Sequence, residues 1–396
     1  MTASELLQAV LVIPVLAGSV FCLLCVWAAA RFFSRRLPAS TYLPPVTVLK
    51  PIYGLDKGLE ENLLSLCRQD HPDYQVVLSV QRADDPALPV VRRLARDFPD
   101  RMTLVVEPSE PVVNGKVQNL VNALRAARHD TLIISDSDVR VTPGYLRAMV
   151  GPLGDPRMGY VCSLYRSTAA DRWFEKLELL SLNADFVPSV IFSSVTGAAN
   201  FCLGASVAFR RHDLERVGGM ASLGDYLVED YELGRRLRGL GKRMILLPHV
   251  IDVLADYPTF PRWWHHQVYW DQNTWTAHPL GFLLTLLIRA VPFAVLFAAA
   301  RGFDSVGWEV LLGALAIRLG TAAWISAGYL GDREGLRALW LLPLRDLFAL
   351  ASWCVAITRR SFEWRGHRFA LTRDGRIVPR GSLAASTSEA RVTRTP

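Results

Sequence analysis

The sequence lacks a dense run of Lys or Arg and has little charge of any kind. Charged residues make up 20% of the 396 residues, and the formal net charge of +7 is spread along the chain. Proteins that bind nucleic acid usually gather their basic residues in patches, so no nucleic-acid partner is expected. The composition, 51% hydrophobic, is more typical of a chain held in a lipid bilayer, whose anionic head groups attract a modest positive charge.

Cysteine is also scarce, and its positions form no framework. Two cysteines, Cys22 and Cys25, form a C-x-x-C, but inside an apolar run where a zinc or redox site is not expected. The others are scattered: Cys67, Cys162, Cys202 and Cys354. This usage indicates a reducing compartment without structural disulfides.

The longest uncharged stretch lies near the N-terminus, between Glu5 and Arg31. Residues 6–30 are almost wholly apolar, which is long enough for a helix that spans a bilayer. A signal peptide is the alternative, but Glu5 makes the start acidic and no small-residue cleavage site follows. Residues 1–36 are therefore expected to be a retained transmembrane anchor. Basic residues after the apolar run place the next segment in the cytoplasm: Arg31, Arg35 and Arg36.

Three further apolar segments, at about 280–300, 306–330 and 339–358, predict C-terminal membrane helices within residues 280–360. In-plane amphipathic helices are the alternative. Charged residues interrupt these segments and are expected to face a partner, a cavity or the interface: Arg289, Arg318, Arg345 and Asp346. The remaining residues, 361–396, are basic and then rich in Ser, Thr and Ala, which predicts a largely disordered tail.

Between these hydrophobic ends, residues 37–255 alternate strands with helices and predict an α/β fold. Strands are expected near 46–49, 75–80, 102–106, 131–134 and 206–209, and helices near 59–66, 88–98, 116–128, 171–183 and 229–238. This alternation is typical of a parallel, doubly wound sheet with right-handed crossovers. Residues 256–279 follow and carry many aromatic side chains with polar tips, which favour a helix at the membrane–water boundary.

The strand at 131–134 ends in Asp136-Ser137-Asp138, at the sheet edge where α/β proteins bind ligands. Two carboxylates with this spacing can hold a divalent cation, which in turn neutralises a diphosphate. The alternative is that Asp136 and Asp138 only cap the following turn.

Three other polar clusters stand near predicted strand ends or helix starts: Asp84-Asp85, Lys116 and Glu229-Asp230. Each has a structural explanation by itself, since Asp84-Asp85-Pro86 fits a turn and acidic residues favour helix starts. Together they suit a sugar-nucleotide transferase, which needs contacts to the nucleotide, positive charge near the phosphates and a base for an acceptor hydroxyl. The acceptor pocket is expected from residues 173–185 and 194–204, where Asn200 and Cys202 stand among small residues, and from the aromatic helix.

Several of these motifs, in this order, resemble the ceramide glucosyltransferase family. The similar segments are Thr47 to Pro51, Asn62-Leu63 through Gln69-Asp70 to Tyr74, Val80-Gln81 through Asp84-Asp85-Pro86, Lys116 through Leu120, Ser135 to Asp138, and Glu229-Asp230-Tyr231. The chain is most similar to the bacterial hopanoid-associated branch, which passes N-acetylglucosamine from UDP to bacteriohopanetetrol, whereas other relatives pass glucose to ceramide. The resemblance covers about residues 46–279 and implies an inverting GT-A domain of glycosyltransferase families 2 and 21.

The resemblance also implies roles for individual residues. Asp84 or Asp85 matches an aspartate that contacts the nucleotide, and Lys50, Pro51, Gln81 and Lys116 stand in the same donor-side motifs. Asp136 matches the second aspartate, with Asp138 completing the metal-associated pair. Asp230, preceded by Glu229, matches the general base.

One motif departs from the family pattern. A Gln/Arg-x-x-Arg-Trp motif is expected on the aromatic helix, and here it reads His266-Gln267-Val268-Tyr269-Trp270. Trp270 is kept, but Tyr269 replaces an arginine that would help neutralise the leaving UDP. Three explanations are open. Tyr269 with His265 or His266 stabilises the leaving UDP, Arg262 extends to it from earlier in the helix, or the protein is a diverged member of the family.

The resulting hypothesis is a membrane-bound inverting glycosyltransferase of the bacterial inner membrane, with its catalytic domain facing the cytoplasm. It would use Mg2+ or Mn2+ and UDP-glucose or UDP-N-acetylglucosamine, and its acceptor would be a membrane lipid. The alternatives are a ceramide glucosyltransferase proper, a non-catalytic binder of nucleotide sugars, a processive polysaccharide synthase and a transporter.

Overall fold

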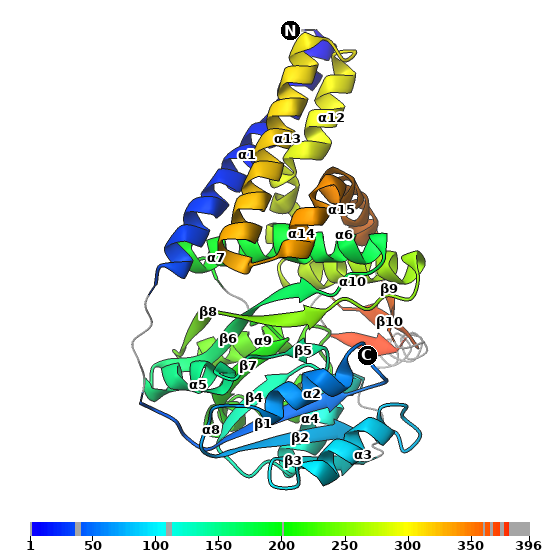
Figure 1. The fold of residues 1–396 in the computed structure, drawn as a ribbon. Coiled ribbons are helices and arrows are strands. Elements are labelled where there is room, and N and C mark those ends of the chain that lie inside the picture. The colour runs from blue at the N-terminus through cyan, green and yellow to red at the C-terminus, as the bar shows by residue number, and fades with distance from the viewer. Residues whose placement is uncertain are drawn as a thin grey trace, which may run out of the picture.

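The computed structural model describes residues 2–35, 41–107, 113–199 and 202–358, with 361–364, 367–372 and 376–379 near the C-terminus. Figure 1 shows a narrow helical bundle standing on a wide α/β body, with the N-terminus at the far tip of the bundle. The body holds an eight-stranded sheet in the order β3-β2-β1-β4-β7-β6-β8-β5. These strands are β1 (Val46–Ile52), β2 (Tyr74–Val80), β3 (Met102–Val106), β4 (Thr131–Ser135), β5 (Val139–Arg140), β6 (Met158–Thr168), β7 (Ser206–Arg210) and β8 (Arg243–Leu254).

The first half of the sheet agrees with the predicted parallel arrangement. Strands β3, β2, β1 and β4 run parallel, and β1, β2 and β4 are buried along their whole length. Burial on both faces explains why their sequences are apolar runs rather than alternating patterns. The chain passes from β1 outward to β3 and then returns to β4 on the other side of β1. The order therefore reverses between β1 and β4, which is where open α/β sheets bind ligands.

The prediction of a wholly parallel sheet is wrong for the second half. Strand β7 pairs antiparallel with β4 on one side and with β6 on the other. A chain of some seventy residues separates β4 from β7, so no short right-handed crossover dictates its direction. The two longest strands, β6 and β8, then pair parallel to each other.

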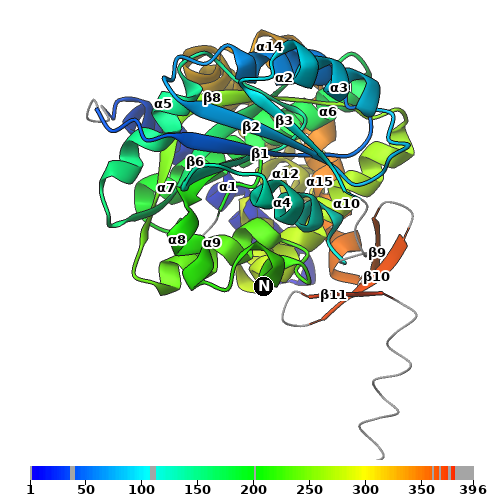
Figure 2. The same ribbon diagram turned by 90° about the horizontal axis from the view of Figure 1, so that it is seen from below.

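Helices cover both faces of this sheet. Figure 2 shows α2 and α3 on one side and α4, α8 and α9 on the other. Their bounds are α2 (Leu59–Cys67), α3 (Leu88–Asp97), α4 (Gly115–Arg125), α5 (Tyr145–Val150), α8 (Arg211–Arg216) and α9 (Glu229–Gly239). Helix α3 shows the physical reason: its apolar Leu88, Val91 and Leu94 are spaced three residues apart and are buried, while the charged side chains between them face outward.

Three helices lie between the sheet and the bundle (Figure 1). Helix α6 (Trp173–Ser181) continues through a π-helical turn (Leu182–Phe186) into α7 (Val187–Thr196), and α10 (Phe260–Ala277) is the predicted aromatic helix. The buried Trp263 of α10 packs against Phe174 and Leu177 of α6. The aromatic side chains of α10 therefore form an apolar layer between the α/β body and the bundle.

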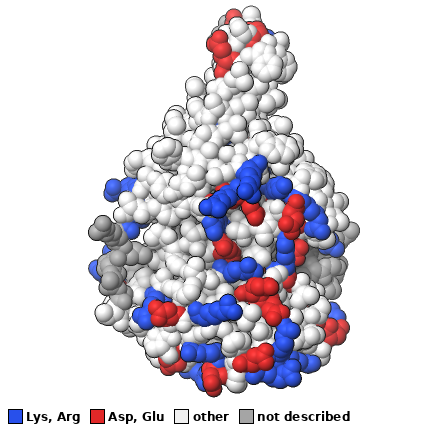
Figure 3. Space-filling view, in the orientation of Figure 1, with Lys and Arg blue, Asp and Glu red and all other residues white. Residues whose placement is uncertain are grey.

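The bundle consists of α1 (Ala3–Phe33), α12 (Ala290–Ala300) and α13 (Ser305–Ile325). Its outer surface is apolar: Leu6, Val10, Ile13, Leu16 and Val20 of α1 are each more than half exposed. Figure 3 shows the bundle almost free of charge between a charged tip and the charged body. An apolar face of this kind is typical of contact with lipid.

In the part of the chain that the structure describes, four helices are long and apolar enough to cross a membrane. They are Ala3–Phe33, Trp173–Thr196, Ser305–Leu330 and Arg333–Thr358. The segment expected as one helix at 280–300 is instead broken at Arg289, where α11 (Pro279–Leu284) and its 3-10 extension (Thr285–Ile288) meet α12 at 52°. Counting this bent pair as one span would give up to five. Figure 1 shows α15 (Leu342–Thr358), which follows α14 (Arg333–Ala338), beside the base of the bundle.

The C-terminal segment, for which disorder is expected beyond Arg380, begins with ordered strands. Strands β9 (Ser361–Trp364), β10 (His367–Leu371) and β11 (Ile377–Pro379) form a second, antiparallel sheet. Strand β11 returns to the α/β body, where the Ile377 amide donates to the Asp225 carbonyl over 2.8 Å. Residues 380–396, expected to be disordered, lie outside the described residues.

Candidate active site

A cleft of about 520 Å³ opens at the carboxyl ends of β1 and β4. It is the point where the strand order reverses, and segments from several parts of the chain meet there. Eight residues singled out in the sequence line it: Pro51, Lys116, Asp136, Asp138, Glu229, Asp230, Tyr269 and Trp270. The cleft thus combines the end of β4, the starts of α4 and α9, and the middle of α10.

Lys116 connects the carboxylates of the cleft. Its Nζ lies 2.8 Å from Asp136 Oδ1 and 3.0 Å from Glu229 Oε1. Asn114 caps α4, accepting from the Lys116 amide at 3.0 Å, and its own amide group donates to Glu229 Oε2 at 3.3 Å. Burial alone would lower the pKa of Lys116, but the carboxylates of Asp136 and Glu229 hold this pKa well above its usual value. The ammonium group therefore stays charged at the centre of the cleft.

Asp230 begins α9 on the opposite wall, and its backbone neighbour Tyr231 donates an amide hydrogen bond to its Oδ1 at 2.7 Å. Burial, reinforced by the negative charge of Glu229, raises the pKa of Asp230 to about 7. Gly204 makes this position possible, because a Cβ on Gly204 would lie 2.4 Å from Asp230 Oδ2. The small residue lets the carboxyl lie directly against the backbone of the facing segment.

The turn after β4 brings three carboxyl groups together. Burial, followed by the charges of Asp136 and Asp56, raises the pKa of Asp138 to about 7. Asp56, which follows β1, accepts a hydrogen bond from the Ser137 hydroxyl. Beneath the turn, the fully buried Lys50 donates to Ser135 Oγ at 3.2 Å and to the Asp136 carbonyl. Burial lowers the pKa of Lys50, which holds the turn from below and does not line the cleft.

The cleft is strongly acidic. Among the described residues that line it, the ammonium group of Lys116 faces five carboxyl groups, those of Asp56, Asp136, Asp138, Glu229 and Asp230. A diphosphate placed among these groups would be repelled unless a cation lay between them. Within the described residues, no group of three His, Cys, Asp or Glu side chains could hold a metal ion alone. Asp136 and Asp138 carry the carboxylate oxygens that a divalent cation prefers, and their chemistry fits such an ion.

Other predicted site residues lie outside the cleft. Asp84 is exposed and paired with Arg82, and Asp85 is buried, accepting the Gly54 amide at 3.0 Å and the Ala87 amide at 2.9 Å. Gln81 donates to the Gly115 carbonyl at 2.8 Å, which steadies the start of α4. These residues shape the loops around the cleft without lining it.

Of the residues proposed to replace the missing arginine, some line the cleft and others do not. His266 turns away from the cleft toward Tyr257, whose hydroxyl lies 2.9 Å from Nδ1, and Arg262 is exposed and does not line the cleft. Tyr269 does line it, and burial raises its pKa to about 12, so its hydroxyl is neutral.

Of the expected acceptor-pocket residues, Gly204 lines the cleft, while Cys202 is buried where a Cβ on Gly234 would lie 2.8 Å from it. Asn200 lies outside the described residues.

Sequence reasoning missed several lining residues, among them Asp56, Asn114 and Ile377. Asp56 follows the end of β1, a position that could have been found by applying the strand-end rule to this strand as well. Asn114 precedes α4 as an ordinary capping residue. Ile377 comes from β11 and packs against Leu227 and Tyr269, and no sequence signal near it points to the cleft.

The comparisons with known proteins agree with this geometry. A profile of glycosyl transferase family 21 matches residues 9–377, nearly the whole chain. The chain belongs to this family. Ceramide glucosyltransferase 1 of Caenorhabditis elegans is 24% identical over 383 residues, which cover 91% of this chain and 80% of that protein. The ceramide glucosyltransferase of Komagataella phaffii is 33% identical over 128 residues, which cover 31% of this chain and 25% of that protein.

A solved structure shows the same fold as this family 21 glycosyltransferase. The mannosyltransferase PcManGT from Pyrobaculum calidifontis, in complex with GDP-Man and Mn2+, has a TM-score of 0.54 and 22% identity. The match covers 88% of this chain and 99% of the other. It therefore spans the α/β body and the hydrophobic helices together, and the GT-A fold expected from the sequence is confirmed.

Proposed function

We propose that this glycosyltransferase transfers a hexose or N-acetylhexosamine from a UDP-sugar to a hydroxyl group of a membrane lipid, with inversion at the anomeric carbon. The observation that carries the proposal is Asp230, a carboxyl group with a pKa raised to about 7, in a cleft beside Lys116 and next to the apolar helices. A base whose pKa lies near the working pH is suited to accept a proton from a hydroxyl.

In the proposed reaction, Asp230 takes the proton from the acceptor hydroxyl. The oxygen attacks the anomeric carbon from the face opposite the nucleotide, and the bond from that carbon to the diphosphate oxygen breaks. The sugar then carries the new glycosidic bond, UDP leaves with the electron pair, and the proton remains on Asp230. Gly204 allows the carboxyl group of Asp230 to take this position, because any side chain there would collide with it.

Asp136 and Asp138 would hold a Mg2+ or Mn2+ ion, which offsets the charge of the diphosphate when bound. Lys116 adds a permanent positive charge between Asp136 and Glu229. PcManGT, which has the same fold, binds GDP-Man together with Mn2+, and this supports a nucleotide-sugar donor and a divalent cation here. Pro51 and Tyr53 at the end of β1 would contact the nucleotide, with Gln81 and Asp85 shaping the loops behind them.

The relatives named ceramide glucosyltransferases support UDP-glucose and a sphingolipid acceptor, and the sequence resemblance supports UDP-N-acetylglucosamine and a hopanoid such as bacteriohopanetetrol. In either case the catalytic body, residues 37–255, would face the cytoplasm of a bacterial inner membrane. The aromatic helix region 256–279 would lie at the interface, with 1–36 and 280–360 in the bilayer.

The test is transfer by the purified full chain in nanodiscs, with each of the two donors offered to ceramide or bacteriohopanetetrol and the glycolipid followed by mass spectrometry. Asp230→Asn should lower kcat by roughly 100-fold or more, because the amide cannot accept the proton. UDP binding, measured by calorimetry, should change little. Asp97→Asn, the same change at an exposed carboxylate outside the cleft, is the matched control.

Two results would refute the assignment. If Asp230→Asn transfers sugar as fast as the parent, Asp230 is not the base. If the parent binds UDP-sugar but transfers nothing to any lipid, the protein is a non-catalytic binder of nucleotide sugars. The neutral Tyr269 in place of arginine is the observation that favours this second candidate, and Tyr269→Arg would then be expected to raise activity.

A further inference from the structure

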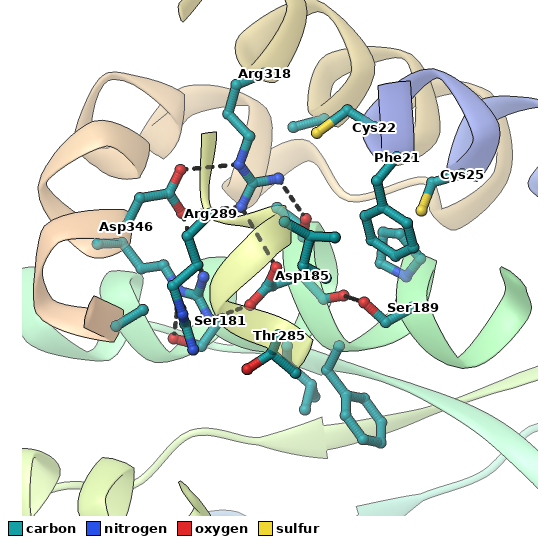
Figure 4. Close-up of a pocket in the computed structure, with 18 of the residues that line it drawn as sticks. Phe21, Cys22, Cys25, Ser181, Asp185, Ser189, Thr285, Arg289, Arg318 and Asp346 are labelled. Atoms are coloured by element: carbon teal, nitrogen blue, oxygen red, sulfur yellow. Dashed lines mark hydrogen bonds and ion pairs between the residues drawn. The ribbon is translucent and has the colours of Figure 1, made fainter. Parts of the chain in front are cut away.

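A second cavity, of about 300 Å³, lies between the α/β body and the helical bundle. Its walls come from α1, the α6–α7 turn, α10, the break before α12, α13 and α15. Figure 4 shows Phe21, Cys22 and Cys25 of α1 on one side, and Arg289, Arg318 and Asp346 on another. The cavity thus has an apolar side on a lipid-facing helix and a polar side deep in the molecule.

Trp270 lines both this cavity and the cleft that holds Asp230. Trp270 therefore borders both a space lined by membrane helices and the proposed site of sugar transfer. A lipid whose tail lies along α1 could place its polar end on one side of Trp270 and its reacting hydroxyl on the other. No other residue in the described part of the chain lines both spaces.

The polar side of the cavity is already balanced in charge. Arg318 binds Asp346 through two hydrogen bonds of 2.9 and 3.0 Å, and Arg345 lies 2.8 Å from Asp185. Among the described lining side chains, four carboxylates (Glu178, Asp185, Asp271 and Asp346) face three guanidinium groups. A phosphate group would add negative charge to a site that already has an excess of it.

The third guanidinium group, that of Arg289, has a buried donor without a hydrogen-bond partner. Its Nε is buried and has no hydrogen-bond partner, and within the described residues Arg289 forms no ion pair. A buried donor left unpaired is costly, so a ligand oxygen at this position would be favoured. The carboxylates around it can in turn accept hydrogen bonds from hydroxyl groups. The site therefore matches a ligand that both donates and accepts but carries no charge.

We propose that this cavity binds the head group of the acceptor, a lipid with an uncharged, hydroxyl-bearing head group, and that Arg289 donates a hydrogen bond to one of its oxygens. The inference rests on the proposed transfer to a lipid and adds the place where the acceptor binds and the side chain that holds it. Trp270 separates the bound head group from Asp230, and the acceptor hydroxyl passes this side chain to reach the base.

Two variants test the site by different means. Arg289→Gln removes the charged donor, and Ala349→Phe fills the cavity from α15 without removing a side-chain hydrogen bond. Each should raise the KM for the lipid acceptor about tenfold and leave the KM for the donor unchanged. The full chain in nanodiscs is used, and slow hydrolysis of the UDP-sugar by water reports on the donor cleft independently.

Matched controls come from positions that do not line the cavity. Arg337→Gln changes an exposed arginine of α14, and Ala351→Phe adds the same ring two residues further along α15. If the cavity variants change the acceptor KM no more than these controls, the inference is wrong while the proposed function stands. If the parent protein transfers sugar to no lipid, the proposed function fails and the cavity has no acceptor to bind.

The head-group class is tested with acceptors that share one apolar tail. The parent should transfer sugar to the uncharged alcohol at least tenfold faster than to its phosphate ester, and Arg289→Gln should lower the rate with the alcohol. Faster transfer to the phosphate ester would overturn the assignment, because it would show that the arginines bind an anion.

Discussion

The pKa of Asp230 depends on how its carboxyl group is packed. Its carboxyl group is held against Gly204, where any side chain would collide with it, and is surrounded by other acidic groups. The resulting pKa of about 7 is a property of this packing, since an exposed aspartate has a pKa near 4. The same crowding that makes a buried carboxylate unfavourable makes it a stronger base.

This pKa predicts a pH profile. Asp230 is protonated and unable to act as a base below its pKa of about 7, so kcat/KM should rise about tenfold per pH unit below that value and level off above it. Initial rates measured from pH 5 to 9 with either lipid acceptor would show this limb. A rate independent of pH across that range would contradict the role of Asp230.

Asp138 has a pKa raised to a similar value, so a control is needed. Protons compete with a cation for Asp138. If the titration of Asp138 causes the rise in rate with pH, a higher Mn2+ concentration should shift this rise to lower pH. If the titration of Asp230 causes the rise, its midpoint should not change once the cation is saturating.

At the scale of residues, the sequence predicted several residues that line the cleft but not the contacts between them. The aspartates after β4 and at the start of α9 were found because they follow a buried strand and open a helix, which are local patterns. Lys50, by contrast, was expected on the donor side and instead holds the Asp136 carbonyl from below. Its role depends on contacts between residues 85 positions apart, which no local pattern encodes.

At the scale of elements, local periodicity predicted the helices and the buried strands well. The long strands β6 and β8 were not predicted because other residues interrupt their apolar runs, as the charged Arg166 does in β6 and Pro248, which lacks a backbone donor, does in β8. The broken helix at Arg289 was also missed, since its apolar composition continues on both sides of the break. Tertiary contacts decide these features.

Gly18 of α1 packs at this break. A Cβ there would lie 2.7 Å from both the Ile288 carbonyl and the Ala290 amide. Gly18→Ala should therefore destabilise the protein by about 1–3 kcal/mol, because backbone atoms cannot yield as a flexible side chain would. The thermal unfolding midpoint in detergent would measure this loss.

Gly313 of α13 provides the matched control, since a Cβ there would meet nothing within 4 Å. Gly313→Ala should leave the midpoint unchanged or raise it slightly, owing to the better helix propensity of alanine. Equal effects of the two substitutions would show that α1 does not cross the break as closely as described.

The C-terminal strand β11 contributes a wall to the cleft through Ile377, which is 3% exposed. Ile377→Asp would place a charge among Leu227, Val228 and Tyr269, and should raise the donor KM about tenfold by releasing this wall. Ile377→Val, which keeps a branched apolar side chain, should have little effect. Steady-state kinetics with varied UDP-sugar would decide, and an unchanged donor KM in Ile377→Asp would contradict the contact.

At the scale of the whole molecule, the bundle, whose visible surface is almost free of charge, separates a small charged tip from the catalytic body (Figure 3). Arg301 and Asp304 pair at the tip, 2.6 Å apart, and Arg301 also binds Gln8 of α1. If the bundle spans the bilayer, the tip and the body lie on opposite sides of it. The excess of arginine after α1 predicts that the body faces the cytoplasm.

Cysteine labelling of intact cells tests this orientation. In a Cys354→Ser background, which removes the exposed cysteine, Ser4→Cys at the tip should react with a membrane-impermeant maleimide. Asp97→Cys, on the exposed surface of α3, should react only after the cells are opened. Labelling of Asp97→Cys in intact cells would place the body outside.

The position of Ile377 in the chain has a consequence for the order in which the enzyme is synthesised and folds. Every hydrophobic helix among the described residues precedes it in the sequence, and the wall that it adds to the cleft forms when it pairs with the body beside Asp225. A nascent chain that already holds Asp136, Asp230 and Trp270 therefore still has one wall of its cleft missing. Only after the last membrane segment has left the ribosome can the finished pocket form, so synthesis itself orders insertion before catalysis.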